Sequence, residues 1–293
     1  MVAGQTNASG RLAIIAGGGL LPHYLAAAAR RNGENPLIIQ LLEEAAPEWS
    51  GFQVERVSVG NVAGLRQLFA RHAISRVVLS GSVSRRPDWR QIRPTLGFLS
   101  RLPFVFRTLR RGGDNAVLEM VIDLLEALGC QVVGAHEIAP DLLAAPGPVG
   151  TLLPDAEAKE DMRVAIDAAL QLGRLDIGQG AVAVGGRVVA LEGPEGTDAM
   201  LGRVAELRAS GRISQRRKGV LVKLAKPQQD ERADLPAIGL ATLRNASLAG
   251  LSGVVGEAGR SLILDRPDLV RIADETGMFV FGVEIPRLAS VEA

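Results

Sequence analysis

Short apolar runs alternate with helix-like stretches along the first half of the chain. Residues 12–16 are continuously apolar and predict a buried strand, and residues 20–31 then have the spacing of a helix. Further strands are expected at 36–41, 54–59, 76–81 and 131–135, and helices at 62–72 and 116–128. This alternation is typical of a parallel sheet covered by helices. We therefore predict a Rossmann-like α/β domain over residues 10–145.

The second half predicts a different sheet. A turn-rich stretch at 144–150 marks the domain boundary, and Gly185 and Gly186 sit between two apolar runs that read as a hairpin. Strands are expected at 177–184, 187–192, 219–224, 253–258, 261–264 and 278–283, and helices at 155–172, 196–210, 240–249 and 267–276. The strands at 253–258 and 261–264 are joined at Gly259 and Arg260. We predict an α/β domain with a mixed sheet over residues 146–288.

Composition narrows the function classes. The 293 residues can bury two moderate cores, and 47% hydrophobic residues exclude a disordered chain. No apolar run approaches the ~20 residues of a membrane span. Cys130 is the only cysteine, which disfavours a disulfide framework and a zinc site. A net charge of +1 and 3% aromatic residues argue against nucleic acid as a partner.

A glycine run follows the first predicted strand. Gly17, Gly18 and Gly19 precede Leu20 at the expected helix start, where backbone N–H groups can approach a phosphate. Pro22 occupies the third glycine position of the dinucleotide fingerprint, and no acid directly follows the second strand, so a nicotinamide dehydrogenase is disfavoured. The alternative is that the glycines only make a tight turn.

The densest polar segment, residues 223–236, begins where an apolar strand ends. Carboxylates there could hold a divalent metal or activate water, and cations could neutralise a diphosphate. We assign Asp230 and Asp234 to metal binding or water activation, Lys223, Lys226 and Arg232 to phosphate charge, and Gln229 to orientation. Ala225 is a candidate for its position only, as a place where an acid could have been altered. The alternative is a solvated surface loop with weakly paired charges.

Two further turns carry acids and amides. Glu195 and Asp198 are second candidates for metal, and Thr197 lies between them as a candidate substrate ligand. In the first half, Asp114 and Asn115 form a similar turn. For each turn, helix capping is the competing interpretation, because Asp, Asn and Thr are common N-cap residues.

An arginine-rich stretch occupies residues 85–111, where Asp88 is the only acid. It interleaves Trp89, Phe98, Phe104 and Phe106 with leucines. Such a mixture suits a surface lying against acidic headgroups, or a lid over an acyl chain. Core aromatics with solvated arginines between them are the alternative.

These motifs together resemble the LpxI family, the UDP-2,3-diacylglucosamine diphosphatases of lipid A biosynthesis. The resemblance covers nearly the whole chain. It rests on five stretches, of which the last two are the most specific: residues 15–22, 113–118, 178–182, 192–200 and 223–239.

The resemblance implies a metal-dependent hydrolase with a glycine-loop domain and a family-specific C-terminal catalytic domain. It implies cleavage of UDP-2,3-diacylglucosamine to UMP and 2,3-diacylglucosamine 1-phosphate (lipid X), with Mg²⁺ or another divalent cation such as Mn²⁺. It also implies a cytoplasmic location, peripheral on the cytoplasmic face of the inner membrane, and leaves a homodimer open. The substrate ligands would include the glycine loop, Asp114, Asn115, Gln179 and Thr197, and residues 99–106 would contact acyl chains.

Two other function classes stay open. One is a non-catalytic protein that binds a nucleotide sugar or lipid phosphate through the same loops. The other is a basic adaptor at a membrane surface.

Overall fold

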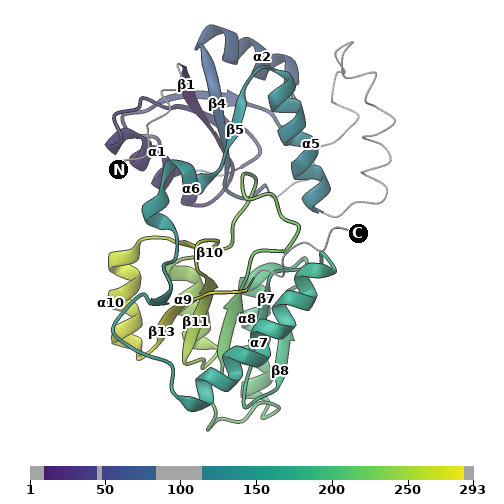
Figure 1. Cartoon of the computed structure of the whole chain (residues 1–293), viewed down its shortest axis with the longest axis vertical. Helices are drawn as coiled ribbons and strands as arrows, with labels where there is room; N and C mark the ends of the chain where they lie inside the picture. The colour runs from purple at the N-terminus through teal and green to yellow at the C-terminus, as the bar shows by residue number, and fades with distance from the viewer. Residues whose placement is uncertain (1–9, 45–47, 84–113, 287–293) are drawn as a thin grey trace. The chain divides into compact units, whose positions relative to one another are not determined.

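The computed structural model describes residues 10–44, 48–83 and 114–286, with the backbone alone for residues 114–116 (Figure 1). The chain forms two compact units. The N-terminal unit contains Met1–Pro140 together with Asp230–Asp234, and the C-terminal unit contains Asp141–Gln229 together with Leu235–Ala293. A short segment from the second half of the sequence therefore belongs to the N-terminal unit.

The N-terminal unit is built on a five-stranded sheet in the order β3-β2-β1-β4-β5. Every neighbouring pair of strands is parallel, which confirms the predicted parallel α/β domain. The strands are β1 (Arg11–Ala16), β2 (Leu37–Leu41), β3 (Gln53–Val57), β4 (Ile74–Ser80) and β5 (Gln131–Val133). The helices among the described residues of this unit are α1 (Leu21–Arg31), α2 (Val62–Arg71), α5 (Asp114–Ala127) and α6 (Ala135–Ile138).

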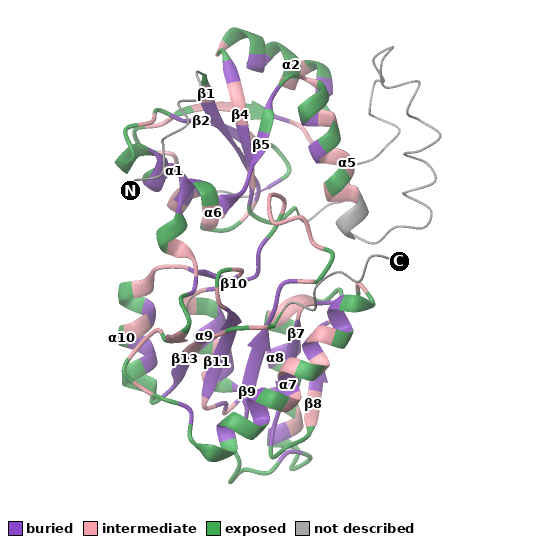
Figure 2. Ribbon diagram, viewed as in Figure 1, coloured by how far each residue is buried: buried purple, intermediate pink, exposed green. Residues whose placement is uncertain are grey.

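The central strand β1 is buried on both faces, as Figure 2 shows for this sheet. Ala13 and Ile15 pack in one cluster with Phe69 of α2 and Ile122 of α5. The intervening residue Ile14 points to the opposite face, because side chains alternate along a strand. Helices on both faces explain why the strand reads as a continuous apolar run.

The C-terminal unit contains a six-stranded sheet in the order β6-β13-β11-β9-β7-β8. β9, β11 and β13 are parallel, whereas β7 is antiparallel to β8 and β9, and β6 to β13, so the sheet is mixed as predicted. The strands are β6 (Gly147–Pro148), β7 (Gly180–Ala183), β8 (Val188–Leu191), β9 (Val220–Lys223), β11 (Gly253–Glu257) and β13 (Phe279–Val283). The helices are α7 (Ala156–Arg174), α8 (Gly196–Ala209), α9 (Leu240–Leu248) and α10 (Arg266–Thr276), and a 3₁₀ turn, η1, spans Pro140–Leu142.

Helices cover both faces of this sheet too. Val220 and Val222 of β9 pack with Met162 of α7. Leu221 packs on the other side, with Met200 of α8 and with residues of α9 and α10. Because side chains on both faces of β9 are packed, this strand is fixed within the sheet. The loop after Lys223 therefore starts from a rigid position.

The two strands predicted on either side of Gly259 and Arg260 are both present, but they lie in different sheets. β12 (Leu262–Ile263) pairs in parallel with β10 (Ala237–Ile238) in a separate two-stranded sheet. The Ser261 hydroxyl accepts a hydrogen bond from the Glu257 N–H at 2.9 Å, and the Leu262 N–H donates to Pro236 O at 2.8 Å. This tight turn directs the chain away from β11 and towards the segment after Pro236.

Candidate active site

Charged residues gather at one end of the C-terminal sheet, where the parallel strands finish. β9 ends there at Lys223 and β11 at Glu257, and β7 starts there because Gly180 pairs with Lys223. Glu192 follows β8, and its N–H donates to Gly180 O at 2.9 Å. Lys223, Glu192 and Glu257 are only 6%, 6% and 5% exposed. Buried charges cost free energy unless they are paired, so three of them at one end of the sheet indicate a functional site.

The residues directly after β9 are held at this end of the sheet. The Lys223 ammonium donates to Ala237 O at 3.0 Å. The Ala225 N–H donates to Glu257 Oε2 at 3.1 Å, while Glu257 Oε1 pairs with Arg260. Ala225 is 3% exposed, so an acidic side chain at this position would be buried. A buried carboxylate costs free energy unless it is paired, so an altered acid at position 225 would need a partner there.

Lys226 and Gln229 shape the turn that follows. The Lys226 ammonium pairs with the Asp176 carboxylate at 2.6 Å. The Lys226 N–H donates to Gln229 Oε1, and the Gln229 N–H donates to Lys226 O, each at 3.1 Å. Gln229 therefore fixes the loop conformation, and the charge of Lys226 is balanced within the protein.

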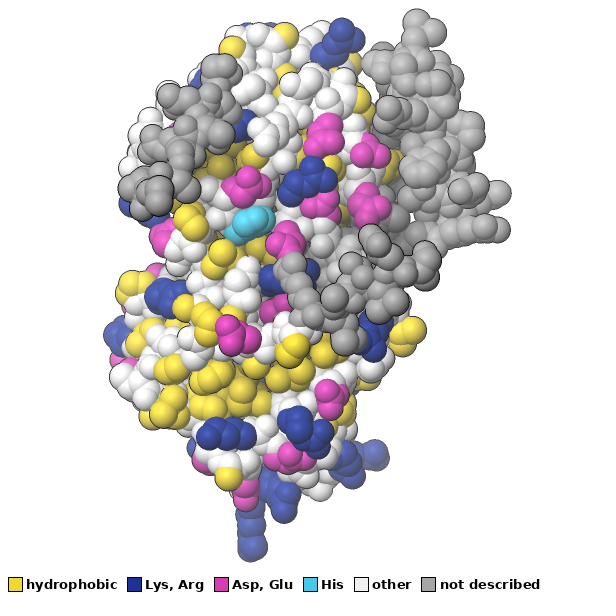
Figure 3. All heavy atoms as spheres, viewed as in Figure 1, with side chains coloured by type: hydrophobic (Ala, Val, Ile, Leu, Met, Phe, Trp, Pro, Cys, Tyr) yellow, Lys and Arg dark blue, Asp and Glu magenta, His cyan; other side chains and the backbone are white. Residues whose placement is uncertain are grey.

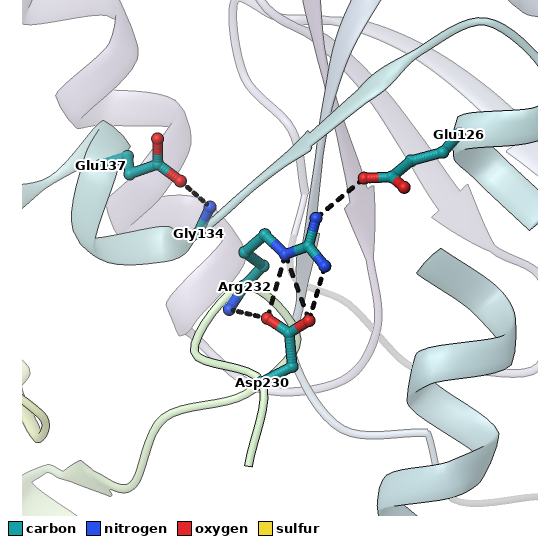
Figure 4. A network of polar contacts seen from close by, with 5 residues as sticks. All are labelled: Glu126, Gly134, Glu137, Asp230 and Arg232. Atoms are coloured by element: carbon teal, nitrogen blue, oxygen red, sulfur yellow. Dashed lines mark hydrogen bonds and ion pairs between the residues drawn. The ribbon is translucent and has the colours of Figure 1, made fainter. Parts of the chain in front are cut away.

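Asp230 and Arg232 form an ion pair with several contacts within the loop (Figure 4). Arg232 Nη2 donates to Asp230 Oδ2 at 2.7 Å, Nε contacts both carboxylate oxygens, and the Arg232 N–H donates to Oδ1 at 2.9 Å. The hydrogen bonds from the guanidinium hold the pKa of the Asp230 carboxyl below its usual value. Asp230 is therefore ionised throughout the neutral range, and Arg232 fixes its orientation.

Three contacts hold Asp230–Asp234 against the N-terminal unit. Arg232 also pairs with Glu126 of α5 at 2.8 Å, as Figure 4 shows. Ala233 packs on the apolar cluster that includes β5 and α5. Glu231 O lies 3.2 Å from the place that a Cβ on Gly134 would occupy, so the loop passes close to the end of β5. The backbone there is braced by Glu137, whose carboxylate accepts the Gly134 N–H at 2.7 Å.

The predicted metal ligands each have other partners. Asp230 accepts from Arg232, Glu195 pairs with Arg203 at 2.9 Å, and Asp198 accepts from Asn245 at 2.9 Å. A hydrogen bond from its own backbone N–H is the main reason that the pKa of Glu195 is lowered. Asp234 is exposed.

The described residues contain no group of three His, Cys, Asp or Glu side chains that could hold a metal ion. The side chains present therefore do not fit a metal site made by protein ligands alone. Mg²⁺ usually takes one or two carboxylates and completes its shell with substrate phosphates and water. Such a cation would arrive with its substrate.

The glycine run has a packing role at two of its three positions. The Gly17 and Gly18 N–H groups donate to Ser80 O at 2.8 Å and Ser82 O at 2.7 Å. A Cβ on Gly17 would overlap Ser82 O, so the glycine lets β1 and β4 end in close contact. Gly19 differs, because it has φ +90° and open space around it. Phosphate binding at this loop would therefore depend on Gly19 and the following α1 terminus, beside the exposed Leu20.

Glu44 is a residue that sequence reasoning missed at this loop. It lies three positions beyond the end of β2 and is 8% exposed. Its Oε2 lies 3.3 Å from the place of a Cβ on Gly18. A carboxylate repels phosphate and accepts hydrogen bonds from hydroxyls, so this side of the loop suits a ribose or sugar hydroxyl better than a phosphate. Glu44 was missed because only acids that directly follow the second strand were considered.

Glu192 is the second residue that was missed. The Thr197 hydroxyl donates to Glu192 Oε1 at 2.8 Å. Glu192 Oε2 and Gln179 Oε1 are both buried and lack a hydrogen-bond partner among the described residues. A Cβ on Gly178 would overlap Glu192 O, and one on Gly180 would overlap Glu192 Oε2. The predicted ligand Thr197 thus contacts a buried acid, and the predicted ligand Gln179 lies between the two glycines that adjoin this acid. The spacing Gly-x-Gly, together with a Glu directly after a strand, was the available signal.

The remaining candidates cannot be placed. α5 begins at Asp114, but the side chains of Asp114 and Asn115 lie outside the described residues. The arginine-rich stretch, with the acyl contacts predicted at 99–106, lies outside them as well.

Comparison with known proteins identifies relatives of both units. Residues 11–142 match the family model of the LpxI N-terminal domain, and residues 145–281 match that of the LpxI C-terminal domain. The UDP-2,3-diacylglucosamine pyrophosphatase LpxI of Caulobacter vibrioides is 41% identical over 275 residues, which cover 94% of this chain and 98% of that protein. The match therefore extends across both units.

Proposed function

Since the chain belongs to the LpxI family, we propose that it hydrolyses the diphosphate of UDP-2,3-diacylglucosamine and releases UMP and 2,3-diacylglucosamine 1-phosphate (lipid X). The observation that carries this proposal is the 41% identity to the Caulobacter pyrophosphatase over almost the full length of both proteins. The loop that holds Asp230 and Arg232 supplies the charges that such a reaction requires.

We assign different roles to the carboxylates and the cations of this loop. Hydrolysis of a diphosphate depends on positioning a water molecule and neutralising the phosphate oxygens. Asp230 is a weak base because Arg232 lowers its pKa, so we assign it to orienting the water or a cation rather than to removing a proton. Lys223, Lys226 and Arg232 are the proposed cations for the phosphate oxygens, which Lys226 and Arg232 would share with their carboxylate partners Asp176 and Asp230. Asp234 is a second carboxylate for the same task as Asp230.

Each unit contains candidate substrate ligands, which we assign unit by unit. Gly19 and the start of α1, with Glu44 beside Gly18, would take the nucleotide. The two orphaned acceptors Glu192 Oε2 and Gln179 Oε1 would accept hydrogen bonds from hydroxyl or amide groups of the substrate, with Thr197 in support. Asp114 and Asn115 remain candidates from their sequence alone.

We also propose that the reaction requires a divalent cation, Mg²⁺ or Mn²⁺. A cation bound to the phosphate oxygens would offset the charge that repels water. Asp230, Asp234, Glu195 and Asp198 are the carboxylates proposed to assist it. Activity that survives complete chelation would contradict the requirement.

The site of action is proposed to be the cytoplasmic face of the inner membrane, with the enzyme as a peripheral protein. In the part of the chain that the structure describes, no helix is both long and apolar enough to cross a bilayer. A homodimer is a further proposal, which the molar mass in solution tests.

One incubation tests the activity. Purified protein with UDP-2,3-diacylglucosamine and Mg²⁺ in ¹⁸O-water should yield UMP and lipid X, and the position of the label identifies the phosphorus that water attacks. A parallel sample with chelator tests the cation. Binding of the intact substrate without cleavage in either sample would instead favour a non-catalytic binding protein.

A further inference from the structure

Exposed cations gather at the end of the C-terminal sheet opposite to Lys223. Arg187 follows the turn between β7 and β8, and the others lie between α8 and β9. We call this set the basic end: Arg187, Arg212, Arg216, Arg217 and Lys218, all exposed. In Figure 3, Lys and Arg side chains project from this end of the C-terminal unit.

A small pocket lies within the basic end. It has a volume of about 250 Å³. Arg187, Arg212 and Arg217 line it together with the apolar side chains of Val184, Val189 and Ile213. A pocket lined by three arginines and three apolar residues matches the chemistry of a phosphate ester attached to a hydrocarbon body.

The cations of the basic end differ from the other arginines of this unit. Arg163, Arg203 and Arg271 all form ion pairs with neighbouring carboxylates. Among the described residues, no carboxylate forms an ion pair with any member of the basic end. Two acids lie near the β7–β8 turn, but Glu160 pairs with Arg163 and Asp161 accepts the Gly186 N–H. The cations of the basic end are therefore not neutralised by direct ion pairs with the described residues.

A buried arginine fixes the backbone of the basic end through hydrogen bonds. Arg208 is 8% exposed and donates to the backbone oxygens of Ser214, Arg217 and Lys218 at 2.5, 2.7 and 2.6 Å. Its Nε donates to Ala249 O at 2.8 Å. Because these bonds fix the backbone of the basic segment, its side chains start from defined positions and lose less entropy on binding.

An exposed leucine lies at the same end of the C-terminal unit. Leu248, the last residue of α9, is 78% exposed and directly precedes Ala249, whose carbonyl Arg208 holds. Cations combined with an exposed apolar side chain are typical of surfaces that rest on anionic lipid. No aromatic side chain lines the pocket, and nucleic acid that stacks on a protein needs one.

We propose that the basic end is the surface through which this protein docks on an anionic phospholipid bilayer, with a headgroup phosphate in the pocket of Arg187, Arg212 and Arg217. This proposal rests on the membrane association proposed above and identifies the surface responsible for it. It does not require that the protein hydrolyses its substrate. β9 runs from the basic end to Lys223, so docking through the basic end leaves the end of the sheet at Lys223 uncovered by the bilayer.

Co-sedimentation with vesicles tests the docking surface. The probes are phosphatidylcholine vesicles with and without phosphatidylglycerol. The unmodified protein should sediment with the anionic vesicles only, and added salt should release it. Arg212→Gln with Arg217→Gln should lower the partition coefficient about 30-fold, since each cation near the surface contributes roughly a factor of five. Leu248→Ser should lower it further.

The matched control is Arg163→Gln with Arg271→Gln, which removes the same charge from exposed helix positions of the same unit. An equal loss in the control would mean that net charge alone governs binding and would overturn the proposal. Failure of the unmodified protein to sediment would overturn it too, as would binding of inorganic phosphate in the pocket without vesicle binding. Hydrolysis of detergent-dispersed substrate, measured on the same variants, should be unchanged, so a failure of docking and a failure of the proposed function can be told apart.

Discussion

Replacing Asp230 by Asn separates a catalytic role from a structural one. The amide keeps the size of the carboxyl but removes the charge that Arg232 binds. The Asp230 side chain is 24% exposed and that of Arg232 40%, so solvent screens the pair and its contribution to stability is about 1 kcal/mol at most. For a unit of this size, that corresponds to a fall in Tm of about 2–4 °C.

The activity should change far more than the stability. A residue that orients the attacking water or a cation contributes about 10²- to 10⁴-fold, so kcat for release of UMP should fall at least 100-fold. The control is Asp268→Asn, which breaks a comparable Asp–Arg pair with Arg271 on α10 and should leave kcat unchanged. Retention of more than a tenth of the activity by Asp230→Asn would refute the assignment.

The pH dependence of stability provides an independent check on the same pair. Arg232 lowers the pKa of Asp230 in the folded protein, so the pair stabilises the fold above the ordinary carboxyl pKa of about 3.9 and the effect is lost as the pH falls through the lowered value. The difference in unfolding free energy between the unmodified protein and Asp230→Asn should therefore be constant near pH 7 and vanish once the pH has fallen below the lowered pKa of Asp230. A difference that grows on acidification would show that the pair does not act in this way.

Three further changes probe the C-terminal unit. Glu192→Gln should raise KM by roughly 10-fold or more with little change in Tm, since a charged acceptor for substrate hydrogen bonds is lost, and an unchanged KM would remove Glu192 from the site. Gly178→Ala should destabilise by about 2 kcal/mol in urea unfolding because its Cβ meets Glu192 O, whereas Gly202→Ala on α8, with open space around it, should be neutral or stabilising. Arg208→Met should cost about 3 kcal/mol because it leaves several carbonyls unsatisfied, and thermal unfolding that matches the unmodified protein would contradict this.

The longer strands and helices were predictable from the apolar pattern. β1 and β9 are buried on both faces, so their runs of apolar residues identified them without knowledge of their partners. The shortest strands were predictable only in part. β6 and β10 have two residues each, which is too few for a period, and they were missed. β12 falls within the predicted strand at 261–264, but its pairing with β10 depends on the turn at Ser261.

The candidate site was only partly predictable for a related reason. The loop after Lys223 stood out through its charge, but its sequence gave no sign that Asp230–Asp234 belongs to the N-terminal unit. That placement depends on an ion pair with Glu126 and on the packing of Ala233, both far away in sequence. The glycine run was recognised, yet the use of the Gly17 and Gly18 N–H groups depends on carbonyls of the β4 end that only the fold brings near.

The polar groups at the two ends of the C-terminal sheet differ in their exposure to solvent. At the end where β9 finishes, Glu192, Lys223 and Glu257 are buried, and glycines at 178 and 180 make room for one of them, which is the arrangement that selective hydrogen bonding requires. At the other end, Lys218 and its neighbouring arginines are exposed and lack carboxylate partners among the described residues, which suits a diffuse, salt-sensitive attraction. Substitutions at the first end should therefore alter KM and kcat on dispersed substrate, and those at the second should alter only the dependence on lipid surface and salt.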